Sequence, residues 1–332
     1  MSEPLLQVEG LCVRFAAAPA GALAIDALGF AIRKGETLAL VGESGCGKSL
    51  TALSLMGLLP KPDAQVVAGR ILLGNEDLAA ASPARMRQVR GGRLGMIFQE
   101  PMTALNPVMR VGDQIAETLR EHEGLSVRQA RAAAVDLLGQ VGIPDPRRRV
   151  EDFPHRLSGG MRQRVMIAMS IACKPDLLIA DEPTTALDVT VQLQILDLLR
   201  KLRAERGMSL LIITHDLGVV AALADRVIVM YAGRKVEEAP VADIFAAPRH
   251  PYTQGLLAAM PGTRGDAQDW DTPPRLHEIP GTVPSVLGRA RGCAFAGRCA
   301  RAEARCSELV PGLTRFVHDH AAACHRLEEA IA

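Results

Sequence analysis

The sequence is poor in aromatic residues and has no long apolar run. Phenylalanine, tyrosine and tryptophan make up 3% of its 332 residues, whereas hydrophobic residues make up 48%. We therefore expect a large core built mainly from aliphatic side chains. No segment reaches the roughly 18 uninterrupted apolar residues of a membrane-spanning helix. The start of the chain also lacks the basic and apolar regions of a secretory signal peptide. These absences favour a chain that stays in the cytosol.

An excess of charge of either sign is missing as well. The chain has 38 basic and 37 acidic residues, for a formal net charge of +1. Proteins that grip nucleic-acid phosphates usually carry a marked basic excess, so the composition argues against a nucleic-acid partner. Seven cysteines in a cytosolic chain indicate ligands or buried thiols rather than disulfides.

The most informative pattern is the glycine-rich loop Gly-Glu-Ser-Gly-Cys-Gly-Lys-Ser at residues 42–49. It follows the short apolar run 37–41 and precedes an apolar helix expected over 48–59. A strand, a glycine-rich loop and a helix in this order bind phosphate through backbone N–H groups and the helix N-terminus. The predicted nucleotide contacts are Gly42, Glu43, Ser44, Gly45, Cys46, Gly47, Lys48, Ser49 and Leu50.

Three side chains of this loop have more specific predicted roles. Lys48 is expected to neutralise the β- and γ-phosphates, and the Ser49 hydroxyl is expected to bind Mg²⁺. Cys46 lies inside the loop, which makes it a candidate target for thiol reagents. Phe15 precedes the loop and is a candidate to stack on adenine, with a place in the core as the alternative.

Four polar residues follow apolar runs and are predicted to face the same nucleotide. The run 177–180 ends in Asp181, predicted to hold Mg²⁺, and Glu182, predicted to polarise the attacking water. His215 follows the run 210–214, and Gln99 follows the run 94–98. Because ligands gather where parallel strands end in open α/β sheets, we expect His215 to reach the γ-phosphate. Gln99 is expected to contact Mg²⁺ or the water.

A second glycine-rich turn, Leu-Ser-Gly-Gly at residues 157–160, precedes a helix expected over 161–173. It has no evident use on the nucleotide bound by the loop of its own chain. Two copies of such a chain could bury ATP between the loop of one and the turn of the other. Ser158, Gly159 and Gly160 are therefore predicted nucleotide ligands across a dimer.

The order of the elements predicts the architecture. Strands alternate with helices such as 189–206, which indicates an α/β fold with a mainly parallel sheet covered on both faces. Helices expected over 111–122 and 126–141 form an insertion. Proline and glycine become frequent beyond residue 248. We expect an ATPase domain over 1–260, with a helical subdomain at about 100–156, and a loop-rich C-terminal region over 261–332.

Taken in order, six elements resemble the ATP-binding subunits of ABC transporters: residues 42–49, Gln99, 157–160, Asp181-Glu182, Ala186-Leu187-Asp188 and His215. The resemblance covers roughly residues 5–260. It implies a P-loop ABC ATPase fold with an antiparallel β portion beside the parallel core sheet. It also implies a head-to-tail dimer that holds two ATP molecules, with Asp188 at the interface between the two subunits. The family usually has Gln where this chain has Met161, a departure that leaves the turn and the helix start intact.

Two further segments resemble the oligopeptide/dipeptide importers: Gln-Glu-Pro-Met-Thr-Ala-Leu-Asn-Pro at 99–107 and Arg-His-Pro-Tyr-Thr at 249–253. Residues 49–54 look closer to the first of the two ATPase subunits of such systems. The resemblance implies a second ATPase subunit, two permease subunits that meet the helical insertion, and an external solute-binding protein. The chain would then sit peripherally on the cytoplasmic face of the inner membrane. Nickel chelates and glutathione remain alternative cargoes, and a soluble non-transport ABC ATPase is a remoter alternative.

Four cysteines, Cys293, Cys299, Cys306 and Cys324, lie near the C-terminus, separated by five, six and seventeen residues. Structural zinc usually takes tightly spaced cysteine pairs, and this tail has none. Four thiolates can hold a [4Fe–4S] cluster, and the resemblance supports that reading. Zinc and four unligated thiols remain the alternatives. Such a site would have a structural role, stabilising a region that is too small to form its own hydrophobic core.

Overall fold

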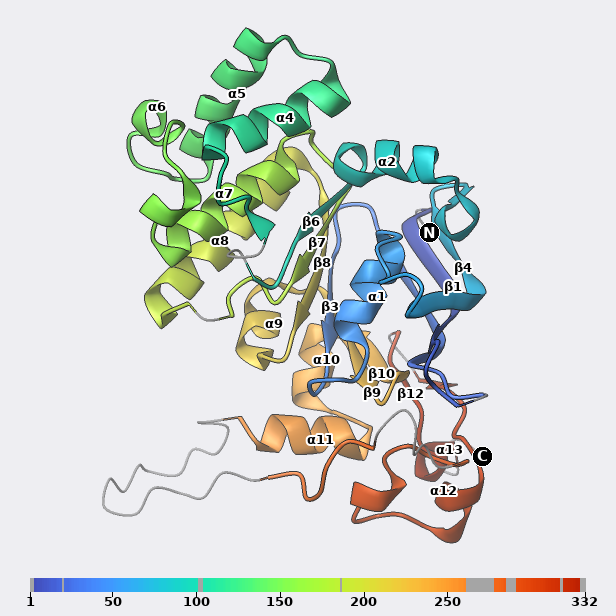
Figure 1. The fold of residues 1–332 in the computed structure, drawn as a ribbon. Coiled ribbons are helices and arrows are strands. Elements are labelled where there is room, and N and C mark those ends of the chain that lie inside the picture. The colour runs from blue at the N-terminus through green and yellow to red at the C-terminus, as the bar shows by residue number, and fades with distance from the viewer. Residues whose placement is uncertain are drawn as a thin grey trace, which may run out of the picture.

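Two β-sheets organise the part of the chain that the structure describes, which comprises residues 3–19, 21–100, 104–185, 187–260, 278–284, 291–316 and 319–328 (Figure 1). The structure is a computed structural model. Parts of three sequence motifs lie outside the described residues: Pro101, Met102 and Thr103 of the importer-like segment, Ala186, and much of the region beyond residue 261.

The larger sheet has the strand order β11-β12-β10-β9-β3-β8-β7-β6. Its strands β6, β7, β8, β3 and β9 run parallel, and β10, β12 and β11 are added antiparallel at one edge. This arrangement confirms the predicted mainly parallel core sheet. The strands are β3 (Thr37–Val41), β6 (Leu94–Ile97), β7 (Leu177–Asp181), β8 (Ser209–Thr214), β9 (Arg226–Tyr231), β10 (Arg234–Pro240), β11 (Thr314–Arg315) and β12 (Ala321–Ala322).

The smaller sheet is antiparallel and has the order β2-β1-β4-β5. It confirms the antiparallel β portion that the family resemblance implied. The sequence indicated only its first strand, because β4 carries a run of exposed residues between two buried ends. The strands are β1 (Pro4–Phe15), β2 (Ile25–Arg33), β4 (Ala64–Leu73) and β5 (Glu76–Asp77).

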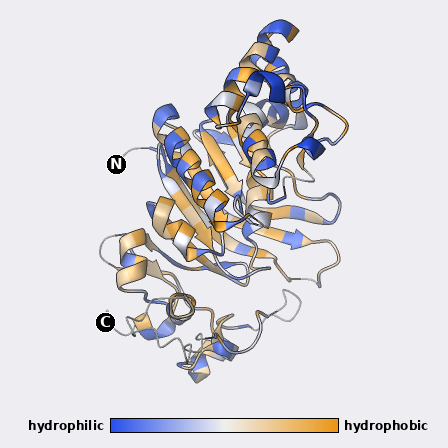
Figure 2. Cartoon of the chain, turned by 90° about the vertical axis from the view of Figure 1, so that its left-hand side faces the viewer, coloured by the Kyte–Doolittle hydropathy of each residue, from blue (hydrophilic) through white to orange (hydrophobic). Residues whose placement is uncertain are grey.

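Both faces of the main sheet are buried. Side chains alternate along each strand, so Leu38 and Leu40 of β3 pack on one side and Ala39 and Val41 on the other. The first side is covered by α1 (Lys48–Leu55), α2 (Pro83–Gly92) and the antiparallel sheet. The second is covered mainly by α7 (Gly159–Ile171), α8 (Val189–Arg206) and α9 (Leu217–Leu223). Figure 2 shows the central strands as the most hydrophobic part of the chain.

The predicted helical insertion is present between β6 and α7. It contains α4 (Val111–Glu123), α5 (Val127–Gln140) and the short α6 (Pro146–Arg149), which lie together beyond one end of the main sheet (Figure 1). A capping box fixes the start of α5, because Ser126 accepts the N–H of Gln129 and Gln129 reaches back to Ser126. Gly124 ends α4 with φ of 66°, a value that glycine adopts without strain.

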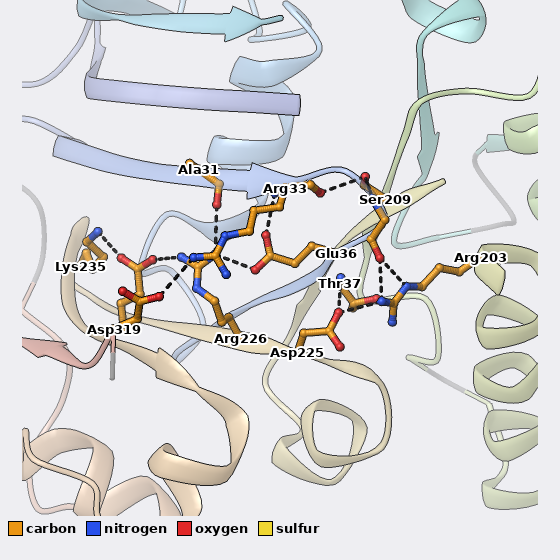
Figure 3. A network of polar contacts seen from close by, with 12 residues as sticks. Ala31, Arg33, Glu36, Thr37, Arg203, Ser209, Asp225, Arg226, Lys235 and Asp319 are labelled. Atoms are coloured by element: carbon orange, nitrogen blue, oxygen red, sulfur yellow. Dashed lines mark hydrogen bonds and ion pairs between the residues drawn. The ribbon is translucent and has the colours of Figure 1, made fainter. Parts of the chain in front are cut away.

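A polar network holds the turn that leads into β3 (Figure 3). Arg226, on β9, is largely buried and pairs with both Glu36 and Glu238; its Nη1 lies 2.6 Å from Oε1 of Glu36. On the opposite side, Asp225 accepts the N–H of Thr37 at 2.8 Å. Buried charges are stable only when they are paired in this way. The network therefore fixes the strand from which the glycine-rich loop emerges.

The C-terminal region joins the main sheet. Strand β12 pairs with β10, so Ala321 and Ala322 lie opposite Glu238 and Glu237. His320 Nε2 lies 2.7 Å from Oε1 of Glu237, and both side chains are buried. The remaining helices are α10 (Val241–Ala246), α11 (Pro251–Ala258), α12 (Ala304–Glu308) and α13 (His325–Glu328). Within the described ranges, no helix has both the length and the apolar character needed to cross a membrane.

Candidate nucleotide-binding site

The glycine-rich loop closes around the amino group of Lys48. Lys48 Nζ donates hydrogen bonds to the carbonyl oxygens of Gly42, at 2.8 Å, and Glu43, at 3.1 Å. Gly42 has φ of 153°, and a Cβ there would lie 2.3 Å from the carbonyl oxygen of Met230. Only glycine fits that position. Helix α1 begins at Lys48, so its free N-terminal N–H groups lie at the loop, where anions bind favourably.

Ser49 and Asp181 meet beneath this loop. The Ser49 hydroxyl donates to Oδ1 of Asp181 at 3.1 Å. Burial raises the pKa of Asp181, and the neighbouring charge of Glu182 acts in the same direction, against the opposing effects of Ser49 and Lys48. A hydroxyl and a buried carboxylate are oxygen ligands of the kind that Mg²⁺ prefers. The residues present therefore fit the predicted magnesium site.

Glu182 lies at the centre of a second group of polar side chains. Its Oε2 accepts hydrogen bonds from Gln99 Nε2 at 3.0 Å and from the Thr185 hydroxyl at 2.9 Å. Nδ1 of His215 lies 3.2 Å from its Oε1. Glu182 has φ of 46°, a left-handed conformation that a non-glycine residue adopts at a cost of about 1–3 kcal/mol. The surrounding contacts hold the carboxylate in this conformation at the end of β7.

The protonation state of Glu182 reflects these contacts. Partial burial alone would raise its pKa, but hydrogen bonds from Thr185 and His215 outweigh that effect and lower it. Glu182 is therefore ionised at neutral pH, as a residue that accepts a proton from water must be.

Two cavities flank the loop. One, of about 320 Å³, is lined by Phe15 and residues of the loop together with Gln99 and Glu182. The other, of about 420 Å³, is lined by the start of the loop, Gln99, Glu182 and His215. Phe15 is 37% exposed, which excludes the alternative of a core position. Loop residues lining at least one cavity are Gly42, Glu43, Ser44, Gly45, Gly47, Lys48, Ser49 and Leu50.

Cys46 does not face either cavity. It is fully buried, and this burial raises its pKa, although nearby Lys48 acts in the opposite direction. The thiolate is the reactive form of cysteine. The structure therefore corrects the expectation that Cys46 is open to thiol reagents.

The turn at 157–160 lies apart from these cavities, which none of its residues line. Ser158 caps α7 by accepting the N–H of Met161 at 3.4 Å, and Ser158 and Gly159 are exposed. At Gly160 a Cβ would lie 2.8 Å from Cγ1 of Val191 on α8. The turn thus presents the start of a helix to the surroundings and leaves the loop of its own chain untouched.

Comparisons with known proteins agree with this geometry. The family model described as ABC transporter matches residues 25–185, and the model described as oligopeptide/dipeptide transporter, C-terminal region, matches residues 236–306. A putative peptide import ATP-binding protein of Brucella abortus is 52% identical over 99% of both chains. The dipeptide transport ATP-binding protein DppD of Bacillus subtilis is 48% identical over 99% of this chain and 98% of its own.

The chain belongs to the oligopeptide/dipeptide family of ABC transporter ATP-binding subunits. Membership confirms the resemblance, the ABC ATPase fold class and the expectation of a transport-coupled ATPase, with ATP as its nucleotide. Among solved structures, the ATP-binding cassette MJ0796, in a dimer bound to ADP and Pi, is 25% identical with a TM-score of 0.63 over 71% of this chain and 98% of its own. CbiO1 of Clostridium perfringens, part of the ABC transporter complex cbiONQ, is 28% identical with a TM-score of 0.64 over 74% of this chain and 92% of its own.

The predicted iron–sulfur cluster is wrong for this ABC subunit. Cys293, Cys299, Cys306 and Cys324 border one small cavity of about 20 Å³. Yet among the described residues no group of three or more Cys, His, Asp or Glu side chains is arranged to hold a metal ion. The names of the relatives mention no such cluster either, and the zinc alternative has no support.

Hydrogen bonding and burial account for these cysteines as thiols. Burial raises the pKa of Cys293 and of Cys324. Cys306 Sγ accepts the N–H of Glu303 at 3.5 Å, and its carbonyl accepts the N–H of Cys293 at 2.7 Å. The four cysteines lie close together, as their clustering in the sequence indicated. They do so because this small region packs together, not because they bind a metal ion.

Three residues near the site were not predicted. Thr185 follows Glu182 by three residues and could have been found from that spacing beside a catalytic carboxylate. Tyr252, whose hydroxyl accepts the N–H of Glu43 at 2.9 Å, lies in the segment 249–253, whose sequence indicates only the sub-family. Arg298 contacts Glu43 across 255 residues of sequence, and no local pattern predicts such a contact.

Proposed function

We propose that this ABC subunit hydrolyses ATP to power the import of di- and oligopeptides through membrane permeases. The observation that carries the proposal is the convergence of Gln99, Glu182 and His215 beside the loop that holds Lys48. Peptide cargo is supported by the printed names of the full-length relatives and by the matched C-terminal family.

In this proposal Glu182 positions and polarises the water that attacks the γ-phosphate. Its carboxylate is ionised and held from three sides, so little reorganisation is needed at the moment of reaction. Gln99 helps to orient the water, and His215 reaches the γ-phosphate from the end of β8. Phe15 stacks on adenine at the mouth of the smaller cavity.

The phosphates are bound by the loop. Residues 42–50 supply backbone N–H groups, and Lys48 exchanges its bonds to two loop carbonyls for bonds to the β- and γ-phosphates. Mg²⁺, held by Ser49, Asp181 and Gln99, would supply neutralisation of the charge on the phosphates.

A second ATPase subunit completes the site. Ser158, Gly159 and Gly160 line no cavity of their own chain, yet they present a helix N-terminus suited to an anion. We place them on the γ-phosphate of the nucleotide held by the partner, with Asp188 at the seam. The partner is a related ATPase in a heterodimer.

The remaining parts of the proposal concern organisation. The ATPase domain spans residues 1–260, with its helical subdomain at about 100–156 facing two permease subunits, and residues 261–332 form the C-terminal region. An external solute-binding protein delivers the peptide. The subunit then lies peripherally on the cytoplasmic face of the inner membrane.

Uptake by reconstituted vesicles tests the proposal. Vesicles that contain this subunit with its partner ATPase and permeases should transport labelled di- or oligopeptides from the side of the solute-binding protein in the presence of MgATP. The same vesicles with Glu182→Gln should bind ATP and transport none over repeated cycles. Uptake of a nickel chelate or glutathione in preference to every peptide tested would contradict the cargo and leave the ATPase assignment standing.

A further inference from the structure

Arg298, in the C-terminal region, forms a two-pronged ion pair with Glu43 of the phosphate loop. Nη1 lies 2.7 Å from Oε2 of Glu43, and Nη2 lies 3.1 Å from Oε1. The side chains of Arg298 and Glu43 are 8% and 28% exposed, so solvent screens this pair less than it screens an exposed surface pair. Glu43 is the second residue of the loop, directly beside Gly42.

Every N–H donor of Arg298 has an acceptor. Nε donates to the carbonyl of Pro280 at 2.8 Å, and Nη2 also donates to the carbonyl of Ile279 at 3.1 Å. Nη1 also donates to the Tyr231 hydroxyl at 3.4 Å. A guanidinium has five N–H donors in one plane, and these contacts use all five. The bond to Glu43 raises the pKa of Arg298, against the effect of its burial, so the charge is permanent. Lysine could not reproduce this fork.

Glu43 is held on its backbone as well as on its side chain. Its N–H donates to the hydroxyl of Tyr252, and its carbonyl accepts from Lys48 Nζ. Tyr252 packs against Phe295 of the C-terminal region, with ring centroids 5.4 Å apart. Arg298 thus contacts Glu43 directly, whereas Phe295 acts on it only through Tyr252, which accepts the Glu43 N–H.

We propose that Arg298 is a positioning residue for nucleotide binding, which holds Glu43 so that the phosphate loop is preorganised for ATP. The proposal rests on the proposed function, because it assumes that residues 42–49 bind the phosphates. It makes the C-terminal region a working part of the nucleotide site. The groups around Glu182 come from other elements, namely the ends of β6, β7 and β8, so Arg298 acts on binding more than on the chemical step.

The test compares variants of the full chain in MgATP binding and in steady-state hydrolysis. Arg298→Met retains the apolar stem and removes all donors, and Glu43→Ala removes the pair from the loop side. Each should weaken MgATP affinity and raise KM about tenfold, with kcat changed less than about threefold. Both changes remove the same ion pair. The MgATP affinity of the double variant should therefore be no lower than that of the single variant with the lower affinity. Arg298→Lys, which keeps the charge and loses the fork, should fall between Arg298→Met and the unchanged chain.

Asp319→Asn is the matched control. It removes an exposed ion pair, with Arg33, that also joins the C-terminal region to the rest of the chain but lies away from the phosphate loop. It should leave the affinity unchanged. Glu43→Ala leaves the other contacts of Arg298 in place, so it tests the proposal even where Arg298→Met does not fold.

Unchanged affinity in folded Glu43→Ala would overturn the positioning role, as would strictly additive losses in the double variant. A fall in kcat with KM unchanged would also overturn it. Failure of the proposed function has a different signature: the unchanged chain would then bind MgATP no better than Lys48→Ala.

Discussion

Ser49 and Asp181 are separated by 132 residues in the sequence, yet the hydroxyl of one donates to the carboxylate of the other at 3.1 Å. The contact joins the first turn of α1 to the end of β7. In the sequence, α1 comes before the helical insertion and β7 comes after it. It therefore brings the phosphate loop and the Asp181-Glu182 pair into a single site. Several expected outcomes depend on this site and on the elements that support it.

Asp181→Asn should raise the Mg²⁺ concentration needed for half-maximal ATP hydrolysis by at least about tenfold, because a neutral amide is a much poorer ligand for a hard cation than a carboxylate. A magnesium titration of the hydrolysis rate measures the change. Asp176→Asn is the control, since Asp176 lies just before the same strand and pairs with Arg93 at the surface. An unaltered magnesium dependence in Asp181→Asn would show that this carboxylate does not serve the cation.

Cys46 should resist alkylation in the folded chain. It is fully buried with a raised pKa, whereas Cys12 is only partly buried. Iodoacetamide followed by peptide mass spectrometry should therefore label Cys12 well before Cys46, and unfolding in urea should remove the difference. Equal labelling rates in the native protein would mean that the loop opens far more readily than its packing indicates.

Glu237 should make the stability of the chain depend on pH. Burial alone would raise its pKa, but hydrogen bonds from His320 and from the N–H groups of Arg249 and His250 lower it below its ordinary value of 4.5. A carboxylate whose pKa is depressed in the folded state stabilises the fold above its unfolded pKa, and the stabilisation is lost as pH falls through the folded value.

Thermal unfolding of Glu237→Gln from pH 7 to acid tests this linkage. Near pH 7 the variant should unfold roughly 5–10 °C below the unchanged chain, because it leaves part of a buried charged network unpaired. The gap should narrow as pH falls below 4.5. A nearby group that also titrates is His250, whose pKa is lowered by burial to about 4. A gap that stays constant down to the acid range would contradict the assigned role of Glu237.

Much of the site could be predicted from the sequence because its residues follow local patterns. Lys48 and Ser49 follow the strand Thr37–Val41 through the glycine-rich loop, Asp181 ends the strand Leu177–Asp181, and His215 follows the strand Ser209–Thr214. Parallel strands deliver such residues to one edge of the sheet. The strand Thr37–Val41 and the helix Val189–Arg206 match their predicted bounds, since their apolar runs are bounded by clear glycine, aspartate or charge signals.

What could not be predicted depends on contacts between distant segments. Arg298 contacts Glu43, and β12 pairs with β10, although the two partners in each contact are far apart in the sequence. The two-residue strands β11 and β12 carry no periodic pattern. For the four C-terminal cysteines the sequence-based prediction was wrong. Their clustering indicated the ligands of a metal site, whereas in the structure the thiols pack within a small region beside Phe295.

The central claim is that Glu182 drives hydrolysis at a site that binds ATP through other residues. Single-turnover hydrolysis and MgATP affinity, measured on the same samples of the unchanged chain and Glu182→Gln, test it most directly, with the exposed-surface variant Glu205→Gln as control. Glu182→Gln should bind MgATP within about threefold of the unchanged affinity and hydrolyse it at least about 100-fold more slowly. Hydrolysis at the unchanged rate in Glu182→Gln would contradict the account.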